Sequence, residues 1–166
     1  PVETVDPLHA LATVAPLASE AALERTFWAR PGERFAIAGV GTAADLTAQG
    51  PGAFAAIDRE WAQLREDALI DDGATGMPAV GPTLLGGFAF DPESTRTTRW
   101  SGFPDASLLL PALQLTAIGD RCWLTTNVIV DAEGEPDVAL ELVATVRERF
   151  VEAPGSLSAS GRGARL

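Results

Sequence analysis

Apolar residues between positions 54 and 68 recur at spacings of three and four, the period of one face of an α-helix. The apolar positions are Phe54, Ile57, Trp61, Leu64 and Ala68. The charged residues of this stretch, Asp58, Arg59, Arg65 and Glu66, lie away from that stripe. Because full burial of each large apolar side chain contributes roughly 2 kcal/mol, we expect the helix to dock on an apolar surface.

Two segments have the composition of β-strands. Residues 34–41, RFAIAGVG, have a β-prone apolar core that ends in glycines, which predicts a strand followed by a turn. Residues 84–92, LLGGFAFDP, predict a strand that ends at Asp91 and Pro92. Gly86 and Gly87 would let another backbone or side chain approach closely, so this second strand is expected to be tightly packed.

Residues 107–118 and 121–130 are two further apolar runs. Gly119 and Asp120 separate them, and this pair is typical of a two-residue hairpin loop. Since Pro111 has no N–H to donate, the first strand should have an edge or a bulge at that position.

The remaining segments predict helix, loop and tail. Residues 135–150 predict a second helix, with Pro136 near its first turn and two arginines near its end. Residues 71–82 are rich in Gly and Pro and predict a surface loop. Taken together, the elements predict an α+β fold, with an antiparallel β-sheet and helices packed outside it.

Charge and cysteine content exclude several classes of protein. The 166 residues carry a net charge of −11, which repels phosphate, and no basic stripe is visible. No nucleic-acid partner and no membrane partner are therefore expected, and no apolar run is long enough to span a bilayer. With Cys122 as the single cysteine and no leader-like segment, a cytoplasmic location is expected.

One motif invites a cofactor hypothesis. Residues 39–44, GVGTAA, match the G-x-G-x-x-A form of a dinucleotide-binding turn and follow a predicted strand. The acidic residues about twenty positions further on, Asp58 and Glu60, fall inside the predicted helix rather than at a strand end. A plain turn after the strand is therefore the preferred interpretation, and cofactor binding is the alternative.

Other chemical groups are too sparse to assemble a site. The acidic residues 131–137 lack the ligand spacing of a calcium loop, since Gly134 falls at the fourth position rather than the sixth. His9 is the single histidine, and Cys122 alternates with apolar neighbours in a predicted strand, as a core thiol would. No residue is assigned to a catalytic, cofactor-binding or metal site. The four tryptophans are interpreted as core residues, with a pocket lining as the alternative: Trp28, Trp61, Trp100 and Trp123.

Five segments taken in order resemble the N-terminal half of isochorismate synthases, members of the chorismate-utilising enzyme family. They are FWARPGERFAIAGVGTA, AAIDREWAQL, GPTLLGGFAFDP, WSGFPDASLLLPALQL and CWLTTN, between residues 27 and 130. In that half, a GGFAFD-type strand precedes a Trp, a turn with Phe and an apolar LxLP strand. The matching residues are Phe88, Phe90, Asp91, Trp100, Phe103, Leu110 and Pro111. The anthranilate synthase branch resembles this chain less, because its strand is rich in Tyr and this chain has none.

The resemblance implies an enzyme that adds water to the chorismate ring while the 4-hydroxyl leaves. The family uses a lysine as general base, a glutamate as general acid, and carboxylates that hold Mg²⁺. All twelve basic residues here are arginines, and a guanidinium cannot act as a base near neutral pH. The resemblance therefore implies a portion that is inactive alone and binds no Mg²⁺ itself, with the catalytic groups, and chorismate binding, requiring a C-terminal half.

The implied fold is half of the anthranilate synthase component I-like fold, a large α/β body around two packed β-sheets. Residues 1–26 would form an N-terminal arm and helix, residues 27–152 the α+β portion, and residues 153–166 a linker toward the C-terminal catalytic half. A lone half would leave an apolar sheet face uncovered, so it is expected to associate with that half or with itself. The products would feed menaquinone or siderophore biosynthesis.

A second hypothesis comes from another class of protein. The four tryptophans and the missing acid and base groups are also typical of a non-catalytic module that binds a ligand or a protein on an aromatic-lined sheet.

Overall fold

The structure is a computed structural model that describes three continuous stretches of the chain. These are residues 23–70, 76–91 and 98–130, together with Leu8, Leu11, Ala12, Ala144 and Glu148. Most of the predicted helix at residues 135–150, the acidic residues 131–137, His9 and the tail at residues 153–166 lie outside the described residues. The expected boundaries of the arm and the linker stay predictions.

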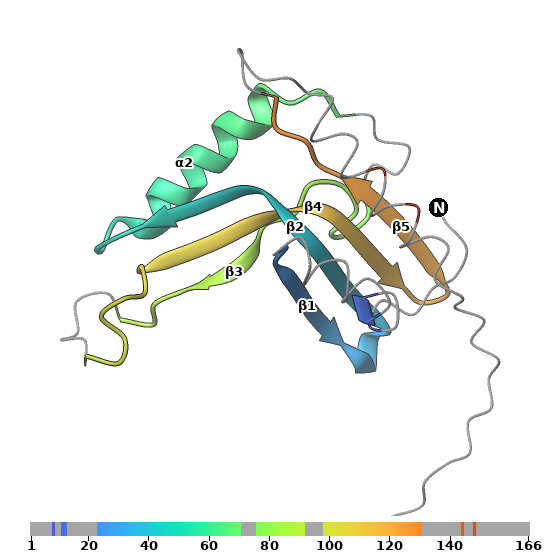
Figure 1. The fold of residues 1–166 in the computed structure, drawn as a ribbon, viewed down its shortest axis with the longest axis horizontal. Helices are drawn as coiled ribbons and strands as arrows, with labels where there is room; N and C mark the ends of the chain where they lie inside the picture. Colours follow the sequence, from blue (N-terminus) through green and yellow to red (C-terminus); the bar gives the residue numbers. More distant parts are fainter. Residues whose placement is uncertain are drawn as a thin grey trace, which may run out of the picture.

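The three continuous stretches form one antiparallel sheet with helix α2 beside it (Figure 1). The strands run in the order β1-β2-β4-β3, and β5 pairs with β4 as well. This arrangement confirms the α+β class. The elements are β1 (Arg25–Arg30), η1 (Pro31–Glu33), β2 (Phe35–Ala48), α2 (Ala53–Glu66), β3 (Leu85–Phe88), β4 (Ala106–Ile118) and β5 (Arg121–Thr126).

Two long strands, β2 and β4, form the centre of the sheet, and both bend near their middle (Figure 1). Beyond the bend, β3 pairs with Ala106–Leu109 of β4, whereas β5 pairs with Leu113–Ile118. The ladder between β2 and β4 shifts register between Thr42 and Ala44, where Pro111 is the partner of Thr42. An irregularity is therefore present beside Pro111, but the extra residue lies in β2 and not in the strand that contains Pro111, where the sequence predicted it.

The turn expected after residue 41 is wrong. β2 continues to Ala48 because β1 pairs with its first half and β4 pairs with it along almost all of its length. Gly41, at a φ of 68°, supplies the left-handed backbone next to the bulge and does not reverse the chain.

The hairpin predicted around Gly119 and Asp120 is confirmed, since Ile118 and Arg121 are partners across the loop. Gly119 adopts a φ of 59°, a conformation that suits glycine. β5 ends at Thr126 rather than at residue 130. There Asn127 continues the contact by a backbone N–H to the Ala112 carbonyl, at 2.8 Å.

The predicted amphipathic helix is confirmed as α2, but its buried face is shifted by one residue at the start. Ala53 and Ile57 are buried with Leu46 and Ala106 of the sheet, and Trp61 and Leu64 pack around this cluster. Phe54, expected to be buried, is 69% exposed. The small Ala53 side chain brings the first turn close to the sheet, so Phe54 points elsewhere.

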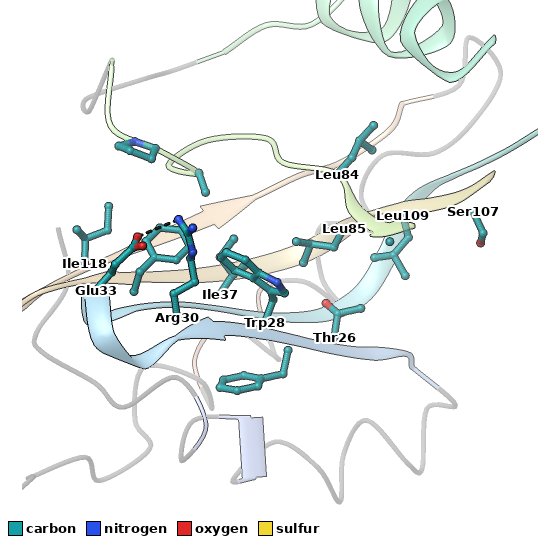
Figure 2. Close-up of a pocket in the computed structure, with 15 residues that line it drawn as sticks. Thr26, Trp28, Arg30, Glu33, Ile37, Leu84, Leu85, Ser107, Leu109 and Ile118 are labelled. Carbon is teal, nitrogen blue, oxygen red and sulfur yellow. Dashed lines mark hydrogen bonds and ion pairs between the residues drawn. The ribbon is translucent and has the colours of Figure 1, made fainter. Parts of the chain in front are cut away.

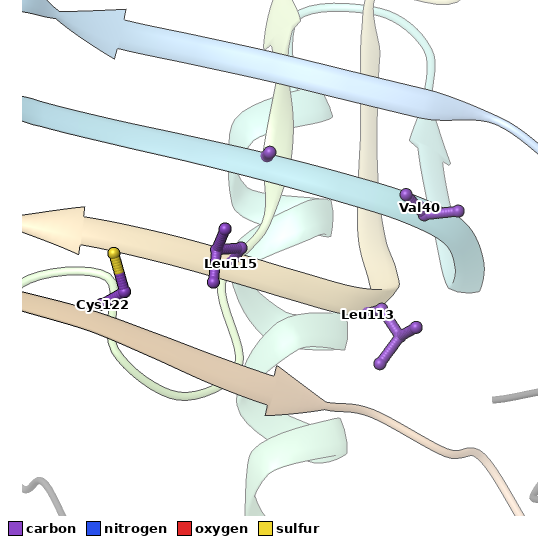
Figure 3. Packing of buried hydrophobic residues seen from close by; sticks show 5 residues of the cluster. Val40, Leu113, Leu115 and Cys122 are labelled. Atoms are coloured by element: carbon purple, nitrogen blue, oxygen red, sulfur yellow. The ribbon is translucent and has the colours of Figure 1, made fainter. Parts of the chain in front are cut away.

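The sequence does not predict the hairpin of β1 and β2, because residues 1–26 are expected to form an arm and helix. β1 pairs with β2 from Arg25 to Arg30. A second apolar cluster lies on this half of the sheet and contains Ala38, Val40, Leu113, Leu115 and Cys122, with Leu11 and Leu23 packed against it (Figure 3). The buried position expected for Cys122 is confirmed.

Candidate functional site

The LLGGFAFDP segment contains a short strand that is tight on one side only. At Gly86, an added Cβ would overlap the carbonyl oxygen of Ser107 and lie 2.7 Å from the Cα of Leu108. At Gly87, an added Cβ would meet nothing within 4 Å. The expectation of tight packing holds for Gly86, whereas Gly87 and Phe88 are exposed.

The aromatic residues that carry the family resemblance lie on the surface around β3. The Phe88 ring is 5.2 Å from the Phe54 ring of α2, measured between centroids. Phe90 is fully exposed, and the rings of Trp100 and Phe103 lie 5.4 Å apart before β4 begins. Leu110 and Pro111, by contrast, are buried in β4. The motif therefore combines a buried β4 anchor with exposed aromatic side chains.

A cavity of about 990 Å³ lies between β1, β2 and the segment that leads into β3 (Figure 2). Trp28, Ile37 and Leu85 point into it from three different segments, as Figure 2 shows. Phe35, Pro78, Ala79, Leu84, Leu109 and Ile118 add apolar lining. A cavity with such walls suits an apolar or aromatic group.

Polar groups at this cavity are few. Arg30 Nη1 donates to Glu33 Oε2 at 2.9 Å, and its guanidinium lies 5.9 Å from the centre of the Trp28 ring. The Thr26 hydroxyl oxygen is buried with no hydrogen-bond partner. Neither Arg30, held by its ion pair, nor the hydroxyls of Thr26 and Ser107 form a recognisable acid and base pair.

Gln114 fixes the segment before β3 onto the sheet. Its side chain is fully buried, and Nε2 donates to the Ala79 carbonyl at 2.8 Å and to Thr116 Oγ1 at 3.0 Å. Thr116 Oγ1 also donates to the Ala79 carbonyl, at 2.6 Å. Because Ala79 lines the cavity, this network sets one of its walls. No local pattern in the sequence revealed it, since the partners lie 35 and 37 residues apart.

Asp105 holds the turn that precedes α2. Its carboxylate is buried and accepts the N–H of Gly50, and its own carbonyl accepts the N–H of Ala89 at 2.6 Å. This aspartate therefore joins the start of β4 to both neighbouring connections. Its position within hydrogen-bonding reach of backbone groups indicates a structural role.

The dinucleotide-binding alternative at residues 39–44 is contradicted by the backbone. These residues lie inside β2, so they form neither the strand-exit turn that was preferred nor a phosphate-binding turn before a helix. Gly39 instead allows close approach, because an added Cβ would overlap Thr26 Oγ1 and lie 2.8 Å from Pro111 Cγ. Asp58 and Glu60 are exposed on α2, as predicted.

No metal site is assembled from the part of the chain that the structure describes. No group of three His, Cys, Asp or Glu side chains gathers there. These residues therefore do not fit the Mg²⁺ that the family resemblance implies. In the same stretches, no helix combines the length and the apolar character needed to cross a bilayer.

The tryptophans divide between core and surface. Trp123 is 7% exposed, in agreement with the core interpretation. Trp28 is 48% exposed and lines the cavity, so the pocket alternative holds for this residue. Trp100 is exposed. Trp61 is half-buried and packs against the apolar cluster between α2 and the sheet. The prediction that all four tryptophans are core residues is therefore wrong.

A family comparison and two related proteins agree on the kind of protein that this chain resembles. A family described as "Chorismate binding enzyme" matches residues 1–161. Isochorismate synthase MenF of Bacillus subtilis is 29% identical over 121 residues, which cover 70% of this chain and 26% of that protein. The salicylate biosynthesis isochorismate synthase of Pseudomonas aeruginosa is 34% identical over 95 residues, which cover 57% of this chain and 18% of that protein. The chain thus aligns with about a quarter or less of each relative.

Proposed function

Because the chain belongs to the chorismate binding enzyme family, we propose that it forms the N-terminal scaffold portion of an isochorismate synthase. The resemblance drawn from the GGFAFD strand and its neighbours agrees with this membership. Such an enzyme converts chorismate into isochorismate. The described sheet would be one portion of the larger α/β body, and the chain would be inactive by itself.

The absence of lysine is the observation that carries this proposal. A base that removes a proton from water near neutral pH needs a pKa near that pH, and a buried lysine can reach it. An arginine stays protonated to pH 12 or beyond, and all twelve basic residues here are arginines. The base must therefore come from polypeptide outside this sequence.

The other catalytic groups are assigned to the same outside polypeptide. The general acid and the carboxylates that hold Mg²⁺ would lie in the C-terminal half. In the described stretches, no three His, Cys, Asp or Glu side chains gather as a metal site would require. Chorismate would bind only when both portions are assembled. The isochorismate would serve menaquinone or siderophore biosynthesis. The name of the Pseudomonas relative gives salicylate biosynthesis as the route of that protein.

The cavity beside Trp28 favours a second candidate function. An apolar cavity of about 990 Å³ with an aromatic wall is what a non-catalytic binding module would present. In that case the chain would bind a ligand or a protein without taking part in chorismate chemistry.

A chimeric enzyme separates the two candidates. The 121-residue region of the Bacillus subtilis enzyme that aligns with this chain would be replaced by the corresponding residues of this chain. With Mg²⁺ and chorismate, the scaffold proposal predicts isochorismate, measured by liquid chromatography, and none from the enzyme with that region deleted. A chimera that is folded by circular dichroism and sedimentation but makes no isochorismate would favour the binding module.

A further inference from the structure

Three phenylalanines form an exposed aromatic surface where α2 begins and β3 ends. Phe54, Phe88 and Phe90 are 69%, 43% and 105% exposed, and we refer to them as the aromatic surface. The rings of Phe54 and Phe88 contact each other at a tilt, with 5.2 Å between their centroids, although α2 and β3 are separated by a long connection. A group of solvent-exposed aromatic side chains such as this is typical of an interaction site.

The strand beside this surface has one unpaired edge among the described residues. β3 pairs only with β4, from Leu85 to Phe88, and none of its four residues is charged. Gly87 leaves open space where a side chain would stand. An uncharged edge of this kind can accept a further strand through backbone hydrogen bonds.

Charge argues against a second copy of this chain as the occupant. Each copy carries a net charge of −11, so two copies repel one another as they approach. The relatives indicate a different occupant, because the aligned regions cover only 26% and 18% of their lengths. Most of the polypeptide in those proteins is thus available to cover surfaces that this region leaves open.

We propose that the aromatic surface and the free edge of β3 are the docking site for the remaining polypeptide of the enzyme. That polypeptide would add a strand to β3 and bury Phe54, Phe88 and Phe90. This inference rests on the proposed function, and it specifies which surface of the chain the catalytic portion covers.

The test compares the same substitutions in two settings, the chain alone and the chimera with the Bacillus subtilis enzyme. The test variant is Phe54→Ser with Phe90→Ser, and the control is Leu69→Ser, which changes a side chain that is also fully exposed. In the chain alone, Leu69→Ser should leave the midpoint of thermal unfolding unchanged, and the double substitution should lower it only slightly, through the loss of the Phe54–Phe88 ring contact. In the chimera, only the double substitution should lower the midpoint, by several degrees. Equal behaviour of both variants in the chimera would overturn the proposal.

Two further measurements keep the outcome decisive. Hydroxyl-radical footprinting should show Phe54 and Phe90 themselves oxidised several-fold more slowly in the folded chimera than in this chain alone. Equal oxidation of these two residues in both settings would overturn the docking site. A defined dimer of this chain that the double substitution abolishes would assign the surface to a second copy, and would also overturn it.

Docking and function can fail separately. A chimera that makes isochorismate but is insensitive to the double substitution would refute the docking site alone. A folded, inactive chimera that the double substitution destabilises would refute the function alone.

Discussion

Gly86 of β3 lies against the backbone of Ser107 on β4, so closely that a Cβ on Gly86 would overlap the Ser107 carbonyl oxygen. This contact lies where Leu85–Phe88 of β3 pair with the first residues of β4. Gly87, its neighbour, has no such constraint. The two glycines of the motif therefore have different roles.

The first prediction concerns these two glycines. Gly86→Ala should lower the free energy of unfolding by about 1–3 kcal/mol, because the strands must separate to admit the methyl group. Gly87→Ala is the matched control and should change it by less than about 0.5 kcal/mol, as expected of a substitution into open space. Urea unfolding followed by tryptophan fluorescence measures both. Equal losses for the two variants would refute the close contact.

The second prediction concerns the buried carboxylate of Asp105. Asp105→Ala removes the acceptor of the Gly50 N–H and should cost about 1–3 kcal/mol of unfolding free energy, since a partly buried donor is left without its partner. The control is Asp120→Ala, which removes an exposed ion pair with Arg34 and should cost no more than about 1 kcal/mol. If Asp105→Ala proves as mild as its control, the hydrogen bond to Gly50 does not hold the turn before α2.

The third prediction concerns Gln114 and depends on pH. Gln114→Glu places a carboxyl group beside the carbonyl oxygens of Ala79 and Gly81 in a fully buried position. Burial and these acceptors favour the neutral acid, so the pKa of the new side chain should rise above its unfolded value of about 4.3. Since the folded state then binds more protons than the unfolded state, stability should fall as pH rises above that unfolded value.

The measurement for this variant is urea unfolding at pH 4 and at pH 7. A rise of two pKa units would destabilise the variant by about 3 kcal/mol at pH 7, and the loss should largely vanish at pH 4. Gln63→Glu, at an exposed position on α2, is the control and should show no such dependence. A stability difference that is the same at both pH values would contradict the buried network.

Local sequence patterns predicted α2 and the hairpin of β4 and β5, because apolar period and the Gly119–Asp120 loop are short-range signals. They missed β1 and the length of β2, since pairing on both edges keeps Gly39 and Gly41 in the sheet. From the sequence, the glycines were expected to end the strand. In the structure, Gly39 lies within β2 and leaves room for the side chains of Thr26 and Pro111.

The candidate site was less predictable than the fold. The cavity joins Trp28, Ile37, Leu85 and Ile118, which come from four strands and meet only when the sheet has formed. The aromatic residues of the GGFAFD segment were recognised from the sequence, but their exposure was not. A phenylalanine next to a strand is buried or exposed according to what packs on that strand, and this information is not local.

The central claim is that these residues provide support while the proton-transfer groups and the metal site belong to other polypeptide. It is tested most directly by incubating the purified chain with chorismate and Mg²⁺ and measuring isochorismate by liquid chromatography, with the intact Bacillus subtilis enzyme as the positive control. The account predicts isochorismate from the control and none from the chain. Turnover by the chain alone would contradict it.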